Sequence, residues 1–326
     1  MHRIQSTINS YNTNNTMATP PKIKIAVIGI GHLGSRHLKV LSELTEQVEI
    51  VGVCDLKEER TQKLASHYKV DFYEHYENLA GRVDAVHVCV PTKLHFEITQ
   101  FFLKHKIHTF VEKPITTTVK EAQQLIRLAD KNNLKLQVGH VERFNAAFES
   151  IKHFTHNPLF IECHRLNTFP NRSLDIGVVM DLMIHDIDII LGLIHSPIKD
   201  IQAVGVNVLT DLEDIANVRL TFKNGCICNL TASRVSDDVT RKIRIFQENT
   251  YISLDYVQQE AFIYRKHENQ ILKHALPIEK EEPLKKEIEH FLDCVRRDQT
   301  PIISGKEALE ALKVALQISQ QIWKKK

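Results

Sequence analysis

The sequence predicts an α/β fold, in which a doubly wound parallel sheet is followed by an α+β domain on a largely antiparallel sheet. Three observations support this prediction. An apolar run with the length of a buried strand, Ile23 to Ile28, ends directly in a glycine-rich turn. Strand and helix patterns then alternate as far as residue 141, which is typical of βαβ units. Beyond this residue strand patterns follow one another directly, as they do in antiparallel sheets.

The glycine-rich turn, Gly29-Ile30-Gly31-His32-Leu33-Gly34, has the pattern G-x-G-x-x-G between a strand and a predicted helix. In that context the first glycine permits the tight turn, the second lets a pyrophosphate approach the backbone, and the third lets the helix pack closely on the sheet. The unpaired N–H groups at the start of the helix then face the phosphates. The sequence therefore predicts a Rossmann dinucleotide site that includes Gly29, Gly31, His32, Leu33 and Gly34.

A second predicted strand supports this interpretation. The strand Val48 to Cys54 is followed by Asp55, at the place where an acid accepts hydrogen bonds from the adenosine ribose. A carboxylate there repels the 2′-phosphate of NADP, whereas Lys57 and Arg60 nearby would attract it. We predict NAD as the cofactor. The alternative for Asp55 is a polar residue at a strand end that binds no ligand.

Length and composition are those of a globular protein with two domains. The chain has 326 residues, of which 43% are hydrophobic and 25% are charged. The formal net charge of +2 gives no electrostatic argument for binding nucleic acid or an anionic membrane. A small anionic ligand remains compatible with this charge. No apolar segment has the length of a transmembrane helix.

The cysteines and the N-terminal segment favour a cytoplasmic location. The six cysteines lie mostly within apolar strand or helix patterns and form no C-x-x-C pair, so we expect buried, reduced thiols. Residues 1–21 are rich in Asn, Thr and Ser and lack the apolar segment of a signal peptide. We predict a disordered tail here, with Met17 as an alternative start of translation.

The predicted first domain covers residues 22–141, after the tail, and the second covers residues 142–326. In the first domain we expect helices near residues 33–41, 57–67 and 93–105, a helix that starts at the capping box Thr118–Glu121, and strands at Asp71–Tyr73, Asp84–Val90, His108–Pro114 and Leu134–Gly139. In the second we expect strands at Phe160–Leu166, Ile201–Val208, Ala216–Phe222, Cys226–Ala232, Arg241–Phe246, Ile252–Tyr256 and Phe262–Arg265, a hairpin at Asn224-Gly225, and two final amphipathic helices over 284–295 and 309–322.

Polar and charged side chains follow the fourth and fifth strands of the predicted parallel sheet. Ligands of such sheets bind outside the carboxyl ends of the strands. We therefore assign to the cofactor site Pro91, Thr92, His95, Glu112 and Lys113. Lys113 would also lie near the nicotinamide, where it suits proton transfer or orientation of a hydroxyl group. The alternative is a surface lysine at a strand end.

A largely apolar helix pattern from Met180 to Leu191 carries a polar stripe. Asp181, His185 and Asp188 stand at i, i+4 and i+7, and should face a polar cleft because burying unpaired charge is costly. An Asp one turn before a His can orient the imidazole, so Asp181 and His185 suit a general base for an alcohol. A zinc site and a satisfied buried histidine are the alternatives. We predict no metal, because no other zinc-type spacing occurs and hydride removal by a nicotinamide needs none.

The segment Gly139 to Asn145 crosses from the last strand of the first domain into the second. Arg143 and Asn145 are therefore predicted to bind a polar ligand in the interdomain cleft, since arginine suits a bidentate phosphate contact. Arg172, on a predicted loop, is a further candidate, with a solvated loop residue as the alternative. The predicted substrate site consists of Lys113, Arg143, Asn145, Arg172, Asp181 and His185.

Three motifs, in this order along the chain, resemble those of the Gfo/Idh/MocA family of NAD(P)-dependent sugar oxidoreductases. They are Gly29-x-Gly31-x-x-Gly34, Glu112-Lys113-Pro114 and Asp181-x-x-x-His185. The resemblance covers roughly residues 22–325. It implies that Lys113, Asp181 and His185 are catalytic or substrate-orienting. It also implies that the second domain is an open-faced sheet, which in this family often forms the interface of a homo-oligomer, here a dimer or tetramer.

Longer stretches resemble family members that act on UDP-N-acetylglucosamine, namely Val111–Thr118, Gln137–Asn145, Asp181–Asp188 and Asn229–Arg234. This resemblance implies oxidation of the 3-hydroxyl of that nucleotide sugar to a ketone, for lipid A made with an amide-linked sugar. The residues alone indicate the hydroxyl of a polar, anionic substrate. One alternative is a dehydrogenase of another sugar or a cyclitol. The other is a non-catalytic NAD-sensing regulator, which would have no need for Lys113, Asp181 and His185.

Overall fold

The structure, a computed structural model, describes residues 21–169, 176–268 and 270–324. The predicted tail over residues 1–21, apart from Pro21, lies outside these ranges, and so does Arg172. The described chain forms two sheets, one of six strands and one of eight. None of its described helices has both the length and the apolar character needed to cross a bilayer.

The first sheet is parallel throughout, which confirms the predicted doubly wound fold. Its strands are β1 (Ile23–Ile28), β2 (Val48–Cys54), β3 (Asp71–Tyr73), β4 (Ala85–Val88), β5 (His108–Glu112) and β6 (Leu136–Gly139). Their order is β3-β2-β1-β4-β5-β6. The winding reverses between β1 and β4, and ligands bind such sheets at this point, outside the carboxyl ends of the strands.

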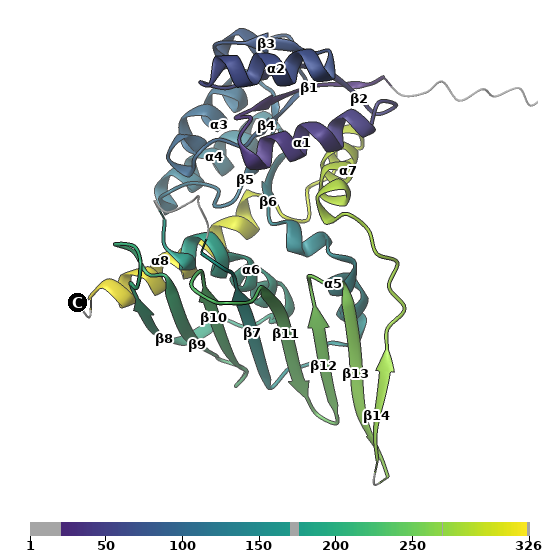
Figure 1. Cartoon of the computed structure of the whole chain (residues 1–326), viewed down its shortest axis with the longest axis vertical. Coiled ribbons are helices and arrows are strands. Elements are labelled where there is room, and N and C mark those ends of the chain that lie inside the picture. Colours follow the sequence, from purple (N-terminus) through teal and green to yellow (C-terminus); the bar gives the residue numbers. More distant parts are fainter. Residues whose placement is uncertain (1–20, 170–175, 269, 325–326) are drawn as a thin grey trace, which may run out of the picture.

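Four helices connect the strands of this sheet and cover it (Figure 1). They are α1 (His32–Glu43), α2 (Glu58–Tyr68), α3 (His95–Lys104) and α4 (Val119–Asn132). The predicted capping box at the start of α4 is confirmed, because the Thr118 hydroxyl accepts a hydrogen bond from the Glu121 amide and the Glu121 carboxylate accepts one from the Thr118 amide. Helix α1 begins at His32, within the glycine turn, so its N-terminus faces the ligand crevice.

The second sheet is antiparallel except where β7 pairs with β10, which confirms a largely antiparallel second domain. Its strands are β7 (Phe160–Leu166), β8 (Ile198–Val206), β9 (Ile215–Phe222), β10 (Ile227–Ser233), β11 (Thr240–Gln247), β12 (Thr250–Asp255), β13 (Glu260–His267) and β14 (Gln270–Ala275). Their order is β14-β13-β12-β11-β7-β10-β9-β8. The predicted turn at Asn224-Gly225 joins β9 to β10, with a φ of +91° at Gly225.

The sequence does not predict the edge strand β14. All six of its residues are exposed, so apolar and polar side chains do not alternate along it. The strand exists because its backbone pairs with β13. Figure 1 shows the two strands as a hairpin at one edge of the sheet.

One face of the second sheet carries the core. Along β7, Ile161, Cys163 and Arg165 are buried, while the residues between them are half-buried on the opposite face. Helices α5 (Ala146–Ile151), α6 (Ile184–Leu193) and α8 (Gly305–Lys324) lie on the buried side, between this sheet and the first domain (Figure 1). No described helix covers the opposite face, so the sheet is open on that side.

Helix α7 (Pro283–Arg296) falls in the range predicted for the second domain but packs on the first sheet. Its Ile288, Phe291 and Leu292 share a buried cluster with Ile25 of β1 and Phe110 of β5. Helix α8 contacts both α4 and α6. The end of the chain therefore joins the two sheets, and the cleft between them is fixed on more than one side.

Candidate active site

A cavity of about 600 Å³ lies between the two sheets. One wall comes from the carboxyl ends of the parallel strands and the glycine turn. The other comes from α6 and the buried face of the second sheet. The predicted site residues that line the cavity are His32, Leu33, Pro91, Thr92, Glu112, Lys113, Asn145, Asp181 and His185.

The glycine turn leaves room for the phosphates of a dinucleotide. Gly29 has a φ of +85°, and a Cβ on Gly34 would lie 1.8 Å from the Gly29 carbonyl oxygen, so both positions require glycine. A Cβ on Gly31 would meet no atom within 4 Å, so the backbone there borders open space. The residues of the turn therefore fit a bound pyrophosphate.

The Asp55 carboxylate lies against this turn. Its Oδ2 accepts a hydrogen bond from the Ile30 amide at 2.6 Å, and its Oδ1 accepts one from the Lys57 amide at 2.9 Å. These bonds fix a negative charge beside the glycine turn, where an adenosine ribose binds in Rossmann domains. The arrangement agrees with a preference for NAD, because the carboxylate would repel a 2′-phosphate.

His95 was predicted to bind the cofactor, but it does not line the cavity. Its two ring nitrogens lie 2.8 Å from the Pro114 carbonyl oxygen and 2.9 Å from the Val90 carbonyl oxygen, and burial lowers the pKa of the imidazole. Pro91 and Thr92, by contrast, border the cavity. His95 therefore fixes the loops after β4 and β5, and the prediction of direct cofactor contact is corrected.

Lys113 and Asp181 connect the two walls of the cavity. The Lys113 Nζ donates to Oδ1 of Asp181 at 3.0 Å and to the carbonyl oxygen of the same residue at 2.6 Å. The Lys113–Pro114 peptide bond is cis. Both side chains remain partly accessible, at 12% and 20%, so the ion pair can meet a ligand in the cavity.

His185 lies on the first turn of α6, at the same cavity. Its Nδ1 is buried and has no hydrogen-bond partner within the described ranges of the chain. Burial first, and then the positive charges of Lys113 and Arg165, lower the pKa of His185 well below its usual value. The imidazole is therefore neutral near pH 7 and has a nitrogen able to accept a proton.

The predicted stripe of Asp181, His185 and Asp188 is formed only in part, because Asp181 and His185 line the cavity whereas Asp188 is buried. Residues Val179–Met183 make a π-helical turn, and α-helical geometry begins only at Ile184, so the i, i+4 spacing of an α-helix does not apply across the junction. Asp181 pairs with Lys113 and not with His185, which corrects the predicted orienting role. Such π turns occur often at functional sites.

Arg143 also differs from the prediction. Its Nε donates to Oδ2 of Asp188 at 2.7 Å, and its Nη2 donates to Oδ1 at 3.1 Å and to the Asp188 carbonyl oxygen at 2.8 Å. The Asp188 side chain is 2% exposed. An internal, bidentate ion pair therefore takes the place of the predicted phosphate contact. Asn145 lines the cavity but caps α5, accepting from the Ala147 amide and donating to the Tyr256 carbonyl oxygen.

The cavity wall holds a buried arginine, Arg165, that was not among the predicted site residues. The Arg165 guanidinium donates to both carboxylate oxygens of Asp186, at 2.9 and 2.8 Å, and to Glu142 at 2.8 Å. A signal was present, because Arg165 follows Ile161 and Cys163 on the inward side of an alternating strand. A charged residue at such a position is rarely buried without a partner, and so marks a polar site. Arg241, opposite Arg165 on β11, lines the same wall.

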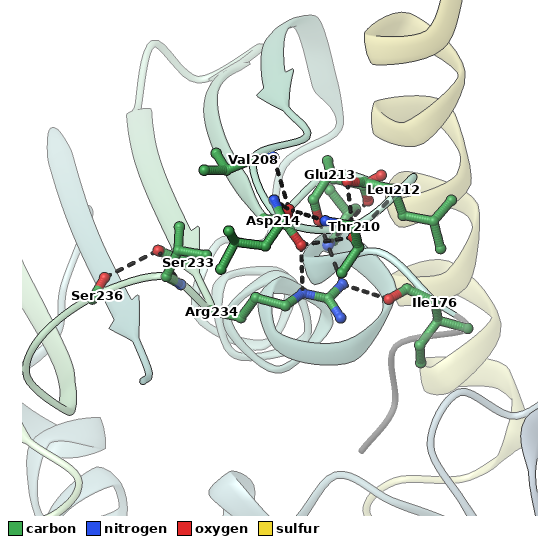
Figure 2. Close-up of polar contacts among 12 residues, drawn as sticks. Ile176, Val208, Thr210, Leu212, Glu213, Asp214, Ser233, Arg234 and Ser236 are labelled. Atoms are coloured by element: carbon green, nitrogen blue, oxygen red, sulfur yellow. Dashed lines mark hydrogen bonds and ion pairs between the residues drawn. The ribbon is translucent and has the colours of Figure 1, made fainter. Parts of the chain in front are cut away.

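Arg234 is a further cavity-lining arginine that was not among the predicted site residues, and Figure 2 shows its contacts. Its Nε lies 3.4 Å from Oδ1 of Asp214, and its Nη2 donates to the carbonyl oxygens of Ile176 and Glu213. The side chain is 2% exposed. Arg234 therefore joins the loop before β9 to the backbone at Ile176, on the rim of the cavity.

Two family profiles match the sequence. Residues 23–140 match the Gfo/Idh/MocA profile described as an oxidoreductase family with an NAD-binding Rossmann fold. Residues 137–253 match the Gfo/Idh/MocA C-terminal domain. The two matches overlap over residues 137–140, at the end of β6.

Two relatives are named for a nucleotide sugar and for a cyclitol. UDP-N-acetylglucosamine 3-dehydrogenase from Acidithiobacillus ferrooxidans is 33% identical over 303 residues, which cover 91% of this chain and 96% of that enzyme. A solved structure of that dehydrogenase from the same organism has a TM-score of 0.88 and covers 93% of this chain and 98% of its own. Myo-inositol 2-dehydrogenase from Thermotoga maritima is 25% identical over 314 residues, or 89% of this chain and 93% of that enzyme.

Proposed function

The chain belongs to the Gfo/Idh/MocA family of oxidoreductases with an NAD-binding Rossmann fold, and on this premise we propose that it oxidises the 3-hydroxyl of UDP-N-acetylglucosamine to a ketone. The observation that carries the proposal is the meeting of Lys113, Asp181 and His185 at one cavity beside the dinucleotide turn. The keto product would serve the synthesis of lipid A with an amide-linked sugar.

His185 and Lys113 suit different parts of an alcohol oxidation. Bound NAD supplies the hydride acceptor. His185 is neutral because its pKa is lowered, so it can take the hydroxyl proton as general base. The Lys113 ammonium, held by Asp181, can donate a hydrogen bond to the same oxygen and stabilise the charge that develops there. Holding alcohol and cofactor together between two walls supplies much of the rate.

Two observations support a nucleotide sugar as the substrate. The relative named for UDP-N-acetylglucosamine is 33% identical to this chain, whereas the one named for myo-inositol is 25% identical. The cavity wall also carries Arg241, whose positive charge suits an anionic diphosphate. A free cyclitol has no charge that would use it.

The test is reduction of NAD by the purified protein with UDP-N-acetylglucosamine, followed by the absorbance of the reduced nicotinamide. Ketone formation is uphill, so the reaction is run with and without an aminotransferase that consumes the keto sugar. UDP-glucose, which lacks the acetamido group, is the matched control, and myo-inositol represents the other relatives. We expect turnover with UDP-N-acetylglucosamine that increases with trapping. Turnover with myo-inositol or a free hexose, and none with the UDP-sugar despite trapping, would refute the proposal.

A further inference from the structure

Behind the cavity wall, three buried side chains that the proposed reaction does not use form a hydrogen-bonded chain. Oε1 of Glu112, at the end of β5, lies 2.9 Å from Nε2 of His37 on α1. Nδ1 of His37 lies 2.8 Å from Nδ1 of His87 on β4. Both histidines are fully buried, and Glu112 is 7% exposed and lines the cavity. This series of hydrogen-bonded side chains therefore runs from the cavity into the core of the first sheet.

The surroundings of Glu112 favour its ionised form. Burial alone would raise the pKa of Glu112, but the hydrogen bond and the electrostatic effect of His37, and then the charge of Lys113, lower it, so the group is a carboxylate that accepts a hydrogen bond from Nε2 of His37. Burial lowers the pKa of His87, which is neutral. The Nε2 of His87 is buried beside Phe110 and Phe291 and has no hydrogen-bond partner in the described chain.

Glu112 keeps its charge while its acidic neighbours do not. Burial, and then the charge of Glu112, raise the pKa of the Cys89 thiol well above its usual value. The same two causes raise the pKa of Glu287 on α7, whose two carboxyl oxygens have no hydrogen-bond partner among the described residues. Both groups are therefore neutral. Of these three acids, Glu112 alone carries a negative charge at this wall.

The Glu112 carboxylate is also held in place. Its Oε2 accepts a hydrogen bond from the Lys113 amide at 3.2 Å. A Cβ on Gly139 of β6 would lie 2.9 Å from the carboxylate, so the group rests directly on the neighbouring strand. Because Glu112 immediately precedes Lys113, a nicotinamide that exchanges hydride with an alcohol at Lys113 must bind close to this charge.

We propose that His37 and His87 are positioning residues that keep Glu112 ionised, so that the cavity favours the oxidised over the reduced cofactor. The oxidised nicotinamide ring is positively charged and the reduced ring is neutral. A fixed carboxylate close by attracts the first and has little effect on the second. Without His37 the carboxyl group would lose its donor in a buried place, and its proton affinity would rise. The inference rests on the nicotinamide cofactor and on Lys113 at the reacting alcohol, and not on the identity of the sugar.

The test measures dissociation constants of NAD⁺ and NADH, without substrate, for the wild type and three variants. Glu112→Gln removes the charge and keeps the shape. His37→Leu removes the donor to Glu112, and His37→Gln keeps a neutral donor. We expect Glu112→Gln and His37→Leu to weaken NAD⁺ binding on the order of tenfold, as a unit charge at close range would, with NADH binding nearly unchanged. His37→Gln should stay close to the wild type.

The ratio of the two constants separates charge from structure. His67→Leu, at an exposed histidine on α2, is the matched control and should leave both constants unchanged. Thermal unfolding and circular dichroism show which variants fold. If His37→Leu does not fold, Glu112→Gln and His37→Gln decide the question. Equal weakening of NAD⁺ and NADH, or an unchanged ratio in a folded Glu112→Gln variant, would overturn the inference. A negative result in the sugar-oxidation assay would not change what these cofactor dissociation constants show.

Discussion

The two residues proposed to act on the substrate hydroxyl differ because their surroundings differ. Lys113 lies within 3.0 Å of a carboxylate, which holds its ammonium as a hydrogen-bond donor. His185 has cations around it and is buried, and both conditions favour the neutral imidazole. A donor and an acceptor of protons therefore meet at one cavity. This pairing is what an alcohol dehydrogenation requires, and it leads to a prediction about each residue.

Removing either side chain should reduce turnover without releasing the cofactor. We expect Lys113→Ala and His185→Ala to lower kcat roughly a hundredfold or more, the usual scale for a positioned acid or base. The dissociation constant for NAD should change little, because neither residue lies at the Asp55 end of the site. The measurement is kcat with the preferred substrate beside NAD binding. Near wild-type kcat in both variants would refute the proposed site, and loss of NAD binding in His185→Ala would show a structural role.

The same site predicts a pH dependence. The groups that face His185 are Lys113, His140, Arg165 and Arg241, and burial is the larger cause of its lowered pKa. The base is therefore active down to a pH below the ordinary imidazole value of about 6.5, and activity is lost only below that. The acidic limb of kcat/KM should accordingly lie below about pH 6.5.

Single residues also show what local patterns can locate. Lys113 and His185, which both line the cavity, could be selected because one stands at a strand end and the other is a polar residue in an apolar helix pattern. Arg143 could not be assigned correctly, because its partner Asp188 lies 45 positions away and only the folded chain brings the two together. Arg165 was missed although its inward position in β7 was readable from the alternation of that strand.

At the scale of elements, local sequence predicts those strands and helices that bury an apolar face. β1, the glycine turn and the capping box of α4 follow from residues close together in the chain. The π turn before α6 and the edge strand β14 do not. The backbone of the π turn contacts Lys113 of the other domain, and β14 exists through pairing with β13. The π turn has a partner far away in the sequence, whereas β14 pairs with the strand that directly precedes it but has no buried face that would mark it as a strand.

The loop between β8 and β9 is folded around one carboxylate, which gives a prediction for stability. Oδ2 of Asp214 accepts hydrogen bonds from three successive backbone amides, and Oδ1 accepts one from a hydroxyl; the donors are Val208, Leu209 and Thr210 (Figure 2). Although burial alone would raise it, these bonds lower the pKa of Asp214 from 3.8 to about 2. A carboxylate with a depressed pKa stabilises the fold above its unfolded pKa, and this contribution is lost as the pH falls through the folded pKa.

We therefore expect Asp214→Asn to destabilise the protein by about 2 kcal/mol near pH 7, as a shift of this size implies. The difference from the wild type should narrow as the pH falls from about 4 toward 2, because the wild-type carboxyl group then takes up a proton. Urea unfolding at a series of pH values measures both effects. A difference that stays constant, or widens as the pH falls, would contradict this account of Asp214.

At the scale of the whole molecule, the active-site cavity depends on two sheets that the chain connects three times. The first connection is the segment after β6, and the others are made by α7 and α8. The sequence shows that α7 is amphipathic but not which sheet buries its apolar face. Only the folded structure shows that Phe291 of α7 packs against Phe110 of β5. The domain boundary at residue 141 remains a prediction. Helix α7 lies beyond this boundary in the sequence but packs on the sheet of the first domain.

The open face of the second sheet carries a ladder of aromatic side chains across neighbouring strands. Phe160 and Phe246 have ring centroids 5.6 Å apart, Phe246 and Tyr251 4.7 Å, and Tyr251 and Tyr264 4.8 Å. All four are half-buried in the single chain, and Val204 and Val206 on β8 are 57% and 49% exposed. An aromatic and aliphatic face of this kind is typical of surfaces that bind another protein. From the family resemblance we expect the partner to be a second copy of this chain.

We predict that the protein is a homo-oligomer, a dimer or tetramer, joined through this aromatic ladder. Tyr251→Glu places a charge in the middle of the ladder and should shift the protein toward the monomer, since an unpaired charge at an interface is costly to bury. Gln299→Glu adds the same charge at an exposed turn and should leave the assembly unchanged. Light scattering after size-exclusion chromatography gives the mass of each variant. A monomeric wild type at micromolar concentration, or an intact oligomer in Tyr251→Glu, would show that this face is not the interface.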